Sequence, residues 1–169
     1  MAQPASHLIT VEVAVTLDGL FRERVKRTPN QVAYRAYSES QNAWRDLAWA
    51  QVDHQVARWQ AALEKDGIKA GDRVAVMLRN CPEWVMYDQA ALGLGLVVVP
   101  LYTQDRPENV AYIIHDSGCK VLLIEGAEQW QSLSGVKGQL SSLVRILTVH
   151  PVPNAGESRT HCAWQIEPS

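Results

Sequence analysis

Two stretches of the sequence have the residue types of phosphate-binding loops. Gly93 and Gly95 are spaced Gly-x-Gly, and residues 132–138, SLSGVKG, gather serine, glycine and lysine. A dinucleotide-binding turn needs a strand before its glycines and a helix after them. Gly93 and Gly95 stand in the reverse order, after a predicted helix and before a predicted strand, which argues against such a turn. The 132–138 cluster precedes its strand and fits no Walker spacing, so we interpret it as a glycine-loosened helix end.

Other side chains that could do acid–base, nucleophilic or metal chemistry lack the neighbours that such chemistry needs. Asp72 follows Gly71 without a partner acid or histidine in the pattern, and is interpreted as part of a turn. Cys81 and Cys119 have no adjacent base and are interpreted as small buried residues. The three cysteines and five histidines show no ligand spacing, so neither a metal site nor a disulfide framework is predicted.

Polar and aromatic side chains lie where predicted strands end. Asn80 separates a strand from a helix, at the edge of a parallel sheet where ligands bind, although an asparagine there also caps helices. Trp84 either packs in the core or faces a substrate channel. Tyr102 either lies at the end of a strand or faces such a channel. Arg79 and Arg106 have the charge to meet phosphates, but a lone surface arginine is usually solvated. Asn80, Trp84 and Tyr102 are therefore the candidate cleft-lining residues, and no residue is assigned as catalytic.

Composition narrows the class of protein. The chain has 169 residues, of which 47% are hydrophobic, enough for about one globular domain with a core. Its 16 basic and 18 acidic residues form no basic stripe, so nucleic acid is not an expected partner. The N-terminus lacks the basic region of a secretory signal, and the longest apolar run, 90–102, is too short to span a membrane. We predict a cytoplasmic protein without a transmembrane segment.

The spacing of apolar residues predicts an α/β fold. Val52, Val56, Trp59 and Leu63 lie on one face of a helix. Four apolar runs without strict alternation are typical of parallel strands covered on both faces, joined by right-handed crossovers. We predict three layers, a mainly parallel sheet with helices on both faces, and a small β hairpin near the N-terminus. The predicted helices cover 16–28, 50–66, 82–94, 107–117 and 127–140, the hairpin 32–38 and 43–49, and the sheet strands 73–78, 96–101, 120–124 and 143–149.

Several stretches between residues 17 and 125 carry a more specific pattern. They include LFRERVKRTPNQVAYR, GDRVAV, the Asn-x-x-Glu-Trp of residues 80–84 and the Val-Pro-Leu-Tyr of residues 99–102. Together they resemble the N-terminal subdomain of the adenylate-forming superfamily. Trp44 and Trp49, where other branches usually carry Tyr or Thr, make the sequence similar to the long-chain fatty acyl-CoA synthetases.

The resemblance implies an activity for a complete enzyme. Members of the superfamily join a carboxylate to ATP with Mg²⁺, release pyrophosphate and pass the acyl-adenylate to the thiol of coenzyme A. A Thr-Ser-Gly-Thr-Thr-Gly-x-Pro-Lys-Gly loop holds the phosphates while charge develops on the leaving group. This sequence has no such loop. ATP, Mg²⁺ and coenzyme A are therefore expected only with the complete enzyme, and this chain alone is expected to hold no cofactor and to be inactive.

The resemblance also implies an organisation of the chain. Residues 1–149 are interpreted as the N-terminal α/β subdomain of an acyl-CoA synthetase-like protein, a scaffold with one wall of the substrate cleft. Residues 150–169 are interpreted as a linker or tail, with WQI as a short strand. A free-standing module that binds a nucleotide or an acyl group, and a protein-interaction domain, stay open as alternatives. An apolar face or sheet edge that the complete enzyme would cover also predicts self-association, most simply as a two-fold dimer.

Overall fold

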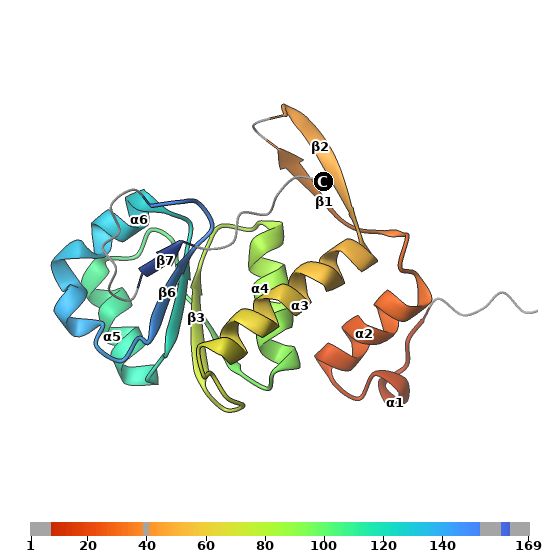
Figure 1. Ribbon diagram of the computed structural model, residues 1–169, viewed down its shortest axis with the longest axis horizontal. Helices are drawn as coiled ribbons and strands as arrows, with labels where there is room; N and C mark the ends of the chain where they lie inside the picture. The colour runs from red at the N-terminus through yellow and green to blue at the C-terminus, as the bar shows by residue number, and fades with distance from the viewer. Residues whose placement is uncertain (1–7, 39–40, 153–159, 163–169) are drawn as a thin grey trace, which may run out of the picture.

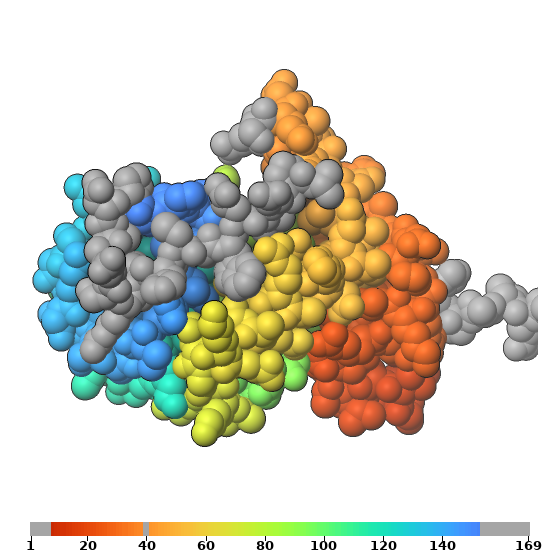
Figure 2. Space-filling view, viewed as in Figure 1, coloured from red at the N-terminus to blue at the C-terminus, as the bar shows by residue number. Residues whose placement is uncertain are grey.

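The computed structural model describes residues 8–38 and 41–152, and the backbone of residues 160–162. A sheet lies between helices (Figure 1), and a two-stranded hairpin projects from the body of the molecule (Figures 1 and 2). Among the described residues, no helix has both the length and the apolar character needed to cross a membrane. In chain order the elements are α1 (Val11–Ala14), α2 (Leu17–Arg27), β1 (Val32–Ser38), β2 (Ala43–Ala48), α3 (Trp49–Lys65), β3 (Arg73–Met77), α4 (Pro82–Gly93), β4 (Val97–Pro100), α5 (Pro107–Ser117), β5 (Val121–Ile124), α6 (Ala127–Ser132), the 3-10 helix η1 (Leu133–Gln139), β6 (Arg145–Thr148) and β7 (Thr160–Cys162).

Five strands form one parallel sheet in the order β4-β3-β5-β6-β7, while β1 and β2 form a separate antiparallel pair. The chain starts this sheet with β3, adds β4 on one side and then crosses to the other side for β5. The winding direction therefore changes between β3 and β5, and the carboxyl ends of these two strands are the topological switch point. The predicted α/β architecture, with a mainly parallel sheet between helices and an N-terminal hairpin, is confirmed.

Each face of the parallel sheet has its own hydrophobic core. Val74 and Val76 of β3 belong to the core that also contains the buried residues of α3 and α4. Ala75 and Met77 belong to the core formed with α5 and η1. All four residues of β5 are buried and alternate between the two cores in the same way. Because both faces are covered, neighbouring positions are all apolar and the strands show no alternation in residue type.

The hairpin runs directly into α3. Strand β2 ends at Ala48, and Trp49, expected as the last strand residue, is the first residue of the helix. The N–H of Ala48 donates to the side chain of Gln51 at 2.8 Å, the return bond of a capping box. The Trp49 ring lies 6.1 Å from the Phe21 ring and 5.8 Å from the Tyr34 ring. Trp49 therefore joins the base of the hairpin to α2.

The glycines of the Gly-x-Gly pair serve packing and chain reversal. An added Cβ at Gly93, the last residue of α4, would lie 2.3 Å from Nε2 of Gln60 and 2.7 Å from Oδ1 of Asp18. Its missing side chain lets α2 and α3 approach α4 closely. Gly95 has a φ of +69°, a conformation that glycine adopts without strain, and it turns the chain into β4.

Two segments differ from the sequence-based expectation. Residues 127–140 are not one helix, because α6 ends at Ser132 and η1 continues as a 3-10 helix. Gly135 and Gly138 fall in η1, and glycine disfavours a regular α-helix. Within 150–169, expected as a linker or tail, Thr160–Cys162 pairs with β6 as a parallel edge strand. The WQI segment lies outside the described residues.

Candidate functional site

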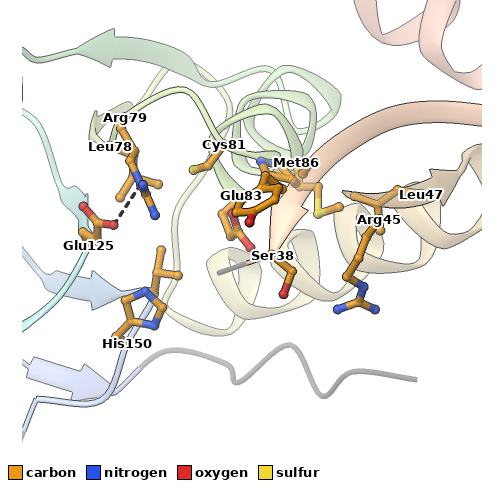
Figure 3. A pocket seen from close by; sticks show the side chains of 14 residues that line it. Ser38, Arg45, Leu47, Leu78, Arg79, Cys81, Glu83, Met86, Glu125 and His150 are labelled. Carbon is orange, nitrogen blue, oxygen red and sulfur yellow. Dashed lines mark ion pairs between the residues drawn. The ribbon is translucent and has the colours of Figure 1, made fainter. Parts of the chain in front are cut away.

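A cleft of ≈510 Å³ lies at the carboxyl edge of the parallel sheet (Figure 3). Leu78 and Arg79 follow β3 and Glu125 follows β5, so the cleft opens at the topological switch point. Ligands of doubly wound sheets bind at this position. The volume lies within the roughly 300–1,000 Å³ of small-molecule sites. The sheet edge, the start of α4 and the inner face of the hairpin form its three walls.

The sheet wall carries an ion pair and a histidine. Nε of Arg79 lies 3.2 Å from Oε1 of Glu125, which joins the end of β3 to the end of β5. The backbone N–H of His150 donates to the carbonyl of Glu125 at 2.8 Å, so the pairing of β5 with β6 continues past both strands. This backbone bond places the side chains of Glu125 and His150 on the same wall. The Arg79–Glu125 pair is solvent-accessible, so a ligand can compete for either partner.

The helix wall contains Cys81, Pro82, Glu83 and Met86. Pro82 is the first residue of α4. An N–H at this position has no acceptor within the helix, so the missing N–H of proline costs no helical hydrogen bond. Burial raises the pKa of the Cys81 thiol to about 11, so this thiol stays protonated at neutral pH. A protonated thiol is a poor nucleophile. The wall therefore suits binding and positioning rather than covalent catalysis.

The hairpin wall places a second arginine opposite the first. Ser38 of β1 and Arg45 and Leu47 of β2 line the cleft. Figure 3 shows the guanidinium of Arg45 on the opposite side of the cleft from Arg79 and His150. Leu47 also packs against the core shared with α3 and α4, which fixes this face of the hairpin toward the body. The cleft thus combines apolar surface with cationic groups on two walls.

The structure places the three candidate cleft-lining residues outside the set that lines this cleft. Asn80 is exposed between Arg79 and Cys81, and the residue at the cap of α4 is Cys81 rather than Asn80. Trp84 is half-buried and packs against the core shared with α3. Tyr102 lies beyond the end of β4 and is 85% exposed. Contact between these residues and a substrate stays a prediction.

Asp72 and Cys119 have structural surroundings. The carboxylate of Asp72 accepts the N–H of Lys69 at 2.9 Å and lies 2.7 Å from Nζ of Lys120. It therefore closes the turn before β3 and pairs with the residue that precedes β5. Cys119 is buried, and burial raises the pKa of its thiol. Both arrangements agree with the interpretation of these residues from the sequence.

Sequence patterns do not single out Arg45, Glu125 or His150. Glu125 follows directly after a predicted strand, and His150 follows another, which is the same signal that points to Asn80. Each could have been found by treating every strand end alike. Arg45 gives no comparable signal, because its place depends on how the hairpin folds back over the sheet.

The Ser/Gly/Lys cluster of residues 132–138 is not placed as a phosphate-binding loop of the cleft. In the Ser/Gly/Lys cluster, Nζ of Lys137 lies 4.4 Å from the centroid of the Trp130 ring. The cluster forms η1, which packs on the sheet face opposite α3 and α4 and does not line the cleft. In the part of the chain that the structure describes, no group of three or more His, Cys, Asp or Glu residues is placed to hold a metal ion.

Comparison with known proteins decides the family. The model of the AMP-binding enzyme family matches residues 21–168. The chain belongs to the AMP-binding enzyme family. A curated relative, the long-chain-fatty-acid–CoA ligase FadD15 of Mycobacterium tuberculosis, is 27% identical over 148 residues, which are 87% of this chain and 24% of FadD15. The fatty acyl-CoA synthetase A of Dictyostelium discoideum is 34% identical over 97 residues, 56% of this chain and 14% of that protein.

Solved structures of acyl-CoA synthetases and related ligases share the fold. A fatty acyl CoA synthetase of Mycobacterium tuberculosis has a TM-score of 0.67 at 27% identity, over 76% of this chain and 25% of that one. Coronafacic acid ligase of Pectobacterium brasiliense has a TM-score of 0.76 at 19% identity, over 86% of this chain and 28% of that one, a likeness in fold alone. The chain spans about a quarter of the length of FadD15 and corresponds to the N-terminal portion of the proteins of this family.

Proposed function

We propose that this chain is the N-terminal scaffold and substrate-cleft portion of an ATP-dependent long-chain fatty acid–CoA ligase. The observation that carries the proposal is the cleft at the switch point of β3 and β5, in a chain of the AMP-binding family. The names of the relatives support the long-chain branch. In a complete enzyme ATP would activate the carboxylate as an adenylate. The part of this chain would be to position substrate through Arg45, Arg79 and the apolar surface between them.

The phosphate-loop pattern does not occur in the sequence, so the isolated chain should be inactive. Without preorganised donors, the charge that develops on pyrophosphate has no partner. We expect no fatty-acid-dependent ATP–pyrophosphate exchange above a control without protein. Exchange that persists through repurification would contradict this part of the proposal.

A chimeric enzyme tests the role of the cleft. This chain would replace the matching quarter of FadD15 from Mycobacterium tuberculosis, and the readout is formation of acyl-CoA from a long-chain fatty acid. An active chimera is the expected result. Arg79→Leu in the chimera should lower kcat/KM by about tenfold or more, since a wall group that positions substrate acts on the transition state.

Arg106→Leu is the matched control. Arg106 is also an exposed arginine beyond the carboxyl end of a strand, but it does not line the cleft. It should leave kcat/KM unchanged. Equal losses from the Arg79 and Arg106 substitutions would mean that the cleft is not part of the substrate site. An inactive chimera that folds normally would contradict the scaffold role.

The same cleft favours one alternative, a module that binds ligand without the rest of an enzyme. All its walls come from this chain, and its volume suits a small molecule. Calorimetric titration of the isolated chain with ATP, a fatty acid and coenzyme A separates the two functions. Binding of one of these ligands that Arg79→Leu weakens would favour the module, and no binding of any would favour the scaffold.

A further inference from the structure

The cleft has a charged end and an apolar end. Arg79, Glu125 and His150 lie at the end that the sheet forms, and Leu47 and Met86 lie at the end between the hairpin and α4 (Figure 3). The apolar end continues into the interior, because Met86 is buried in the core shared with α3 and α4 and Leu47 packs against that core. Such a cleft suits a molecule with an anionic group at one end, which can compete with Glu125 for Arg79, and an apolar chain at the other.

Leu47 closes the apolar end from the side of the hairpin. Figure 3 shows the thioether of Met86 directed toward Leu47 from the wall that α4 forms. Leu47 pairs across the hairpin with Tyr34, whose ring lies 5.8 Å from the Trp49 ring. Tyr34 and Leu47 both pack against the core, which holds this part of the hairpin in place. Because Leu47 is only partly buried and lines the cleft, a molecule in the cleft can touch it.

We propose that Leu47 is a specificity-determining residue that limits the length of the acyl chain held in the cleft. The inference rests on the proposed function, since it takes the fatty acid as the molecule that the cleft holds. With the carboxylate toward Arg79, the acyl chain runs toward Met86, and its last carbons meet Leu47. Each methylene group that is buried on apolar surface favours binding by about fourfold. A methylene group that meets a filled position forces side chains apart, which is unfavourable.

Opposite changes of space at the apolar end separate this role from a merely structural one. Leu47→Ala removes most of a side chain and enlarges this end. Ala36→Leu narrows the cleft, because Ala36 pairs with Arg45 across the hairpin, both residues line the cleft, and directly opposed residues point to the same face of a strand pair. Leu94→Ala is the matched control, since Leu94 is also partly buried against the same core but does not line the cleft.

The test is the chain-length preference of the chimera with FadD15, measured as the ratio of kcat/KM for octadecanoate to kcat/KM for dodecanoate. Leu47→Ala should raise this ratio by about tenfold or more, because even one methylene group in an apolar pocket changes specificity by about that factor. Ala36→Leu should lower the ratio by a similar factor. Leu94→Ala should leave the ratio unchanged. Urea denaturation checks that each variant folds.

An active chimera whose ratio does not respond to Leu47→Ala would overturn the inference and leave the ligase function intact. An equal change of the ratio in Leu94→Ala would also overturn it, because lost packing would then be the cause. If Leu47→Ala does not fold, Ala36→Leu decides alone, and an unchanged ratio in that variant overturns the inference.

A chimera that folds but is inactive would contradict the proposed function rather than the role of Leu47. Calorimetric titration of the isolated chain with dodecanoate and octadecanoate then decides. A shift of the binding preference toward octadecanoate by about tenfold in Leu47→Ala would support the inference. The same preference in the parent and the variant, or no binding of either acid, would overturn it.

Discussion

Arg145 on β6 and Asp66 at the end of α3 form a two-pronged ion pair across 79 residues of sequence. Nε of Arg145 donates to Oδ2 of Asp66 at 2.8 Å, and Nη2 donates to Oδ1. Only 21% of the arginine side chain and 11% of the aspartate side chain are exposed. The pair therefore ties the helical layer that holds α3 to the strand beside the sheet edge.

Removing this pair should destabilise the fold more than removing an exposed one. Arg145→Ala should lower the free energy of unfolding by about 2–4 kcal/mol, because it leaves a mostly buried carboxylate without a partner. Arg35→Ala removes a similar two-pronged pair with Asp46, whose side chains are 64% and 42% exposed, and should cost less than about 1 kcal/mol. Urea denaturation compares the two. Equal losses would mean that burial does not set the strength of these pairs.

Two substitutions at Tyr87 can separate the contribution of its ring to stability from that of its hydroxyl. The side chain is completely buried, its ring meets the Trp59 ring edge-on at 5.5 Å, and its hydroxyl has no hydrogen-bond partner among the described residues. Tyr87→Ala should cost about 3–5 kcal/mol. Tyr87→Phe removes only the unpaired hydroxyl and should be neutral or stabilise the chain by about 1 kcal/mol. Thermal unfolding decides, and a clearly destabilised Phe variant would show that the hydroxyl has a partner.

Gly118 should tolerate a side chain poorly. It ends α5 with a φ of +64°, and an added Cβ would lie 2.7 Å from Nη2 of Arg73. Gly118→Ala should therefore cost about 1–2 kcal/mol from backbone strain alone. Gly135→Ala is the control, because an added Cβ at Gly135 meets no atom within 4 Å. If both variants have the same urea midpoint, the left-handed conformation at Gly118 is not required.

Stability should fall in acid partly through Asp72. The nearby Lys120 ammonium, helped by the Lys69 N–H, holds the pKa of the Asp72 carboxyl below its ordinary value. A carboxyl whose pKa is lower in the folded than in the unfolded chain stabilises the fold above the unfolded pKa, and this contribution is lost as pH falls through the folded pKa. Asp72→Asn should therefore lose less stability than the parent below about pH 4. Urea unfolding at several pH values measures the slope, and an unchanged slope would rule out this contribution.

Self-association is expected through the exposed aromatic pair of the hairpin. Tyr37 is 48% exposed and Trp44 is 66% exposed, with their ring centroids 5.6 Å apart, and β1 and β2 pair only with each other among the described strands. Exposed rings and open strand edges favour contact with a second copy. Light scattering over a wide concentration range should show a dimer that Trp44→Ser weakens. Tyr112→Ser, at a site on α5 that is 67% exposed, is the control. A monomer at every concentration would contradict the prediction.

The parallel sheet is predictable from sequence because burial restricts its residues. All four positions of β5, Val121–Ile124, are buried, so only apolar types fit there. The orientation of α4 is harder to predict. The spacing of apolar residues indicates one buried stripe of Trp84, Tyr87, Ala91 and Leu94. The structure buries Tyr87 and Ala91 and only partly buries Trp84 and Leu94, and it also buries Met86 and Ala90. Because α4 has the sheet on one side and α2 and α3 on others, it is apolar around most of its surface and periodicity cannot select one face.

The cleft is less predictable than the sheet for a similar reason. Arg79 and Glu125 can be placed at strand ends from the sequence, and the switch point follows once the strand order is known. The order itself depends on contacts between distant segments. Arg45 reaches the cleft only because the Leu47 side of the hairpin packs onto the core, a tertiary contact with no local sequence signal.

The division of the interior into two cores has a consequence for how the sequence can change over time. Val56 lies in the core with α3 and α4, and Ile114 lies in the core with α5 and η1, with the sheet between them. Substitutions at sites without shared neighbours are nearly additive in free energy. A substitution in one core therefore needs compensating substitutions only among the residues of that core. Substitutions in the two cores can therefore accumulate independently during evolution. Only the strands of the sheet, whose side chains enter both cores, couple changes in one core to changes in the other.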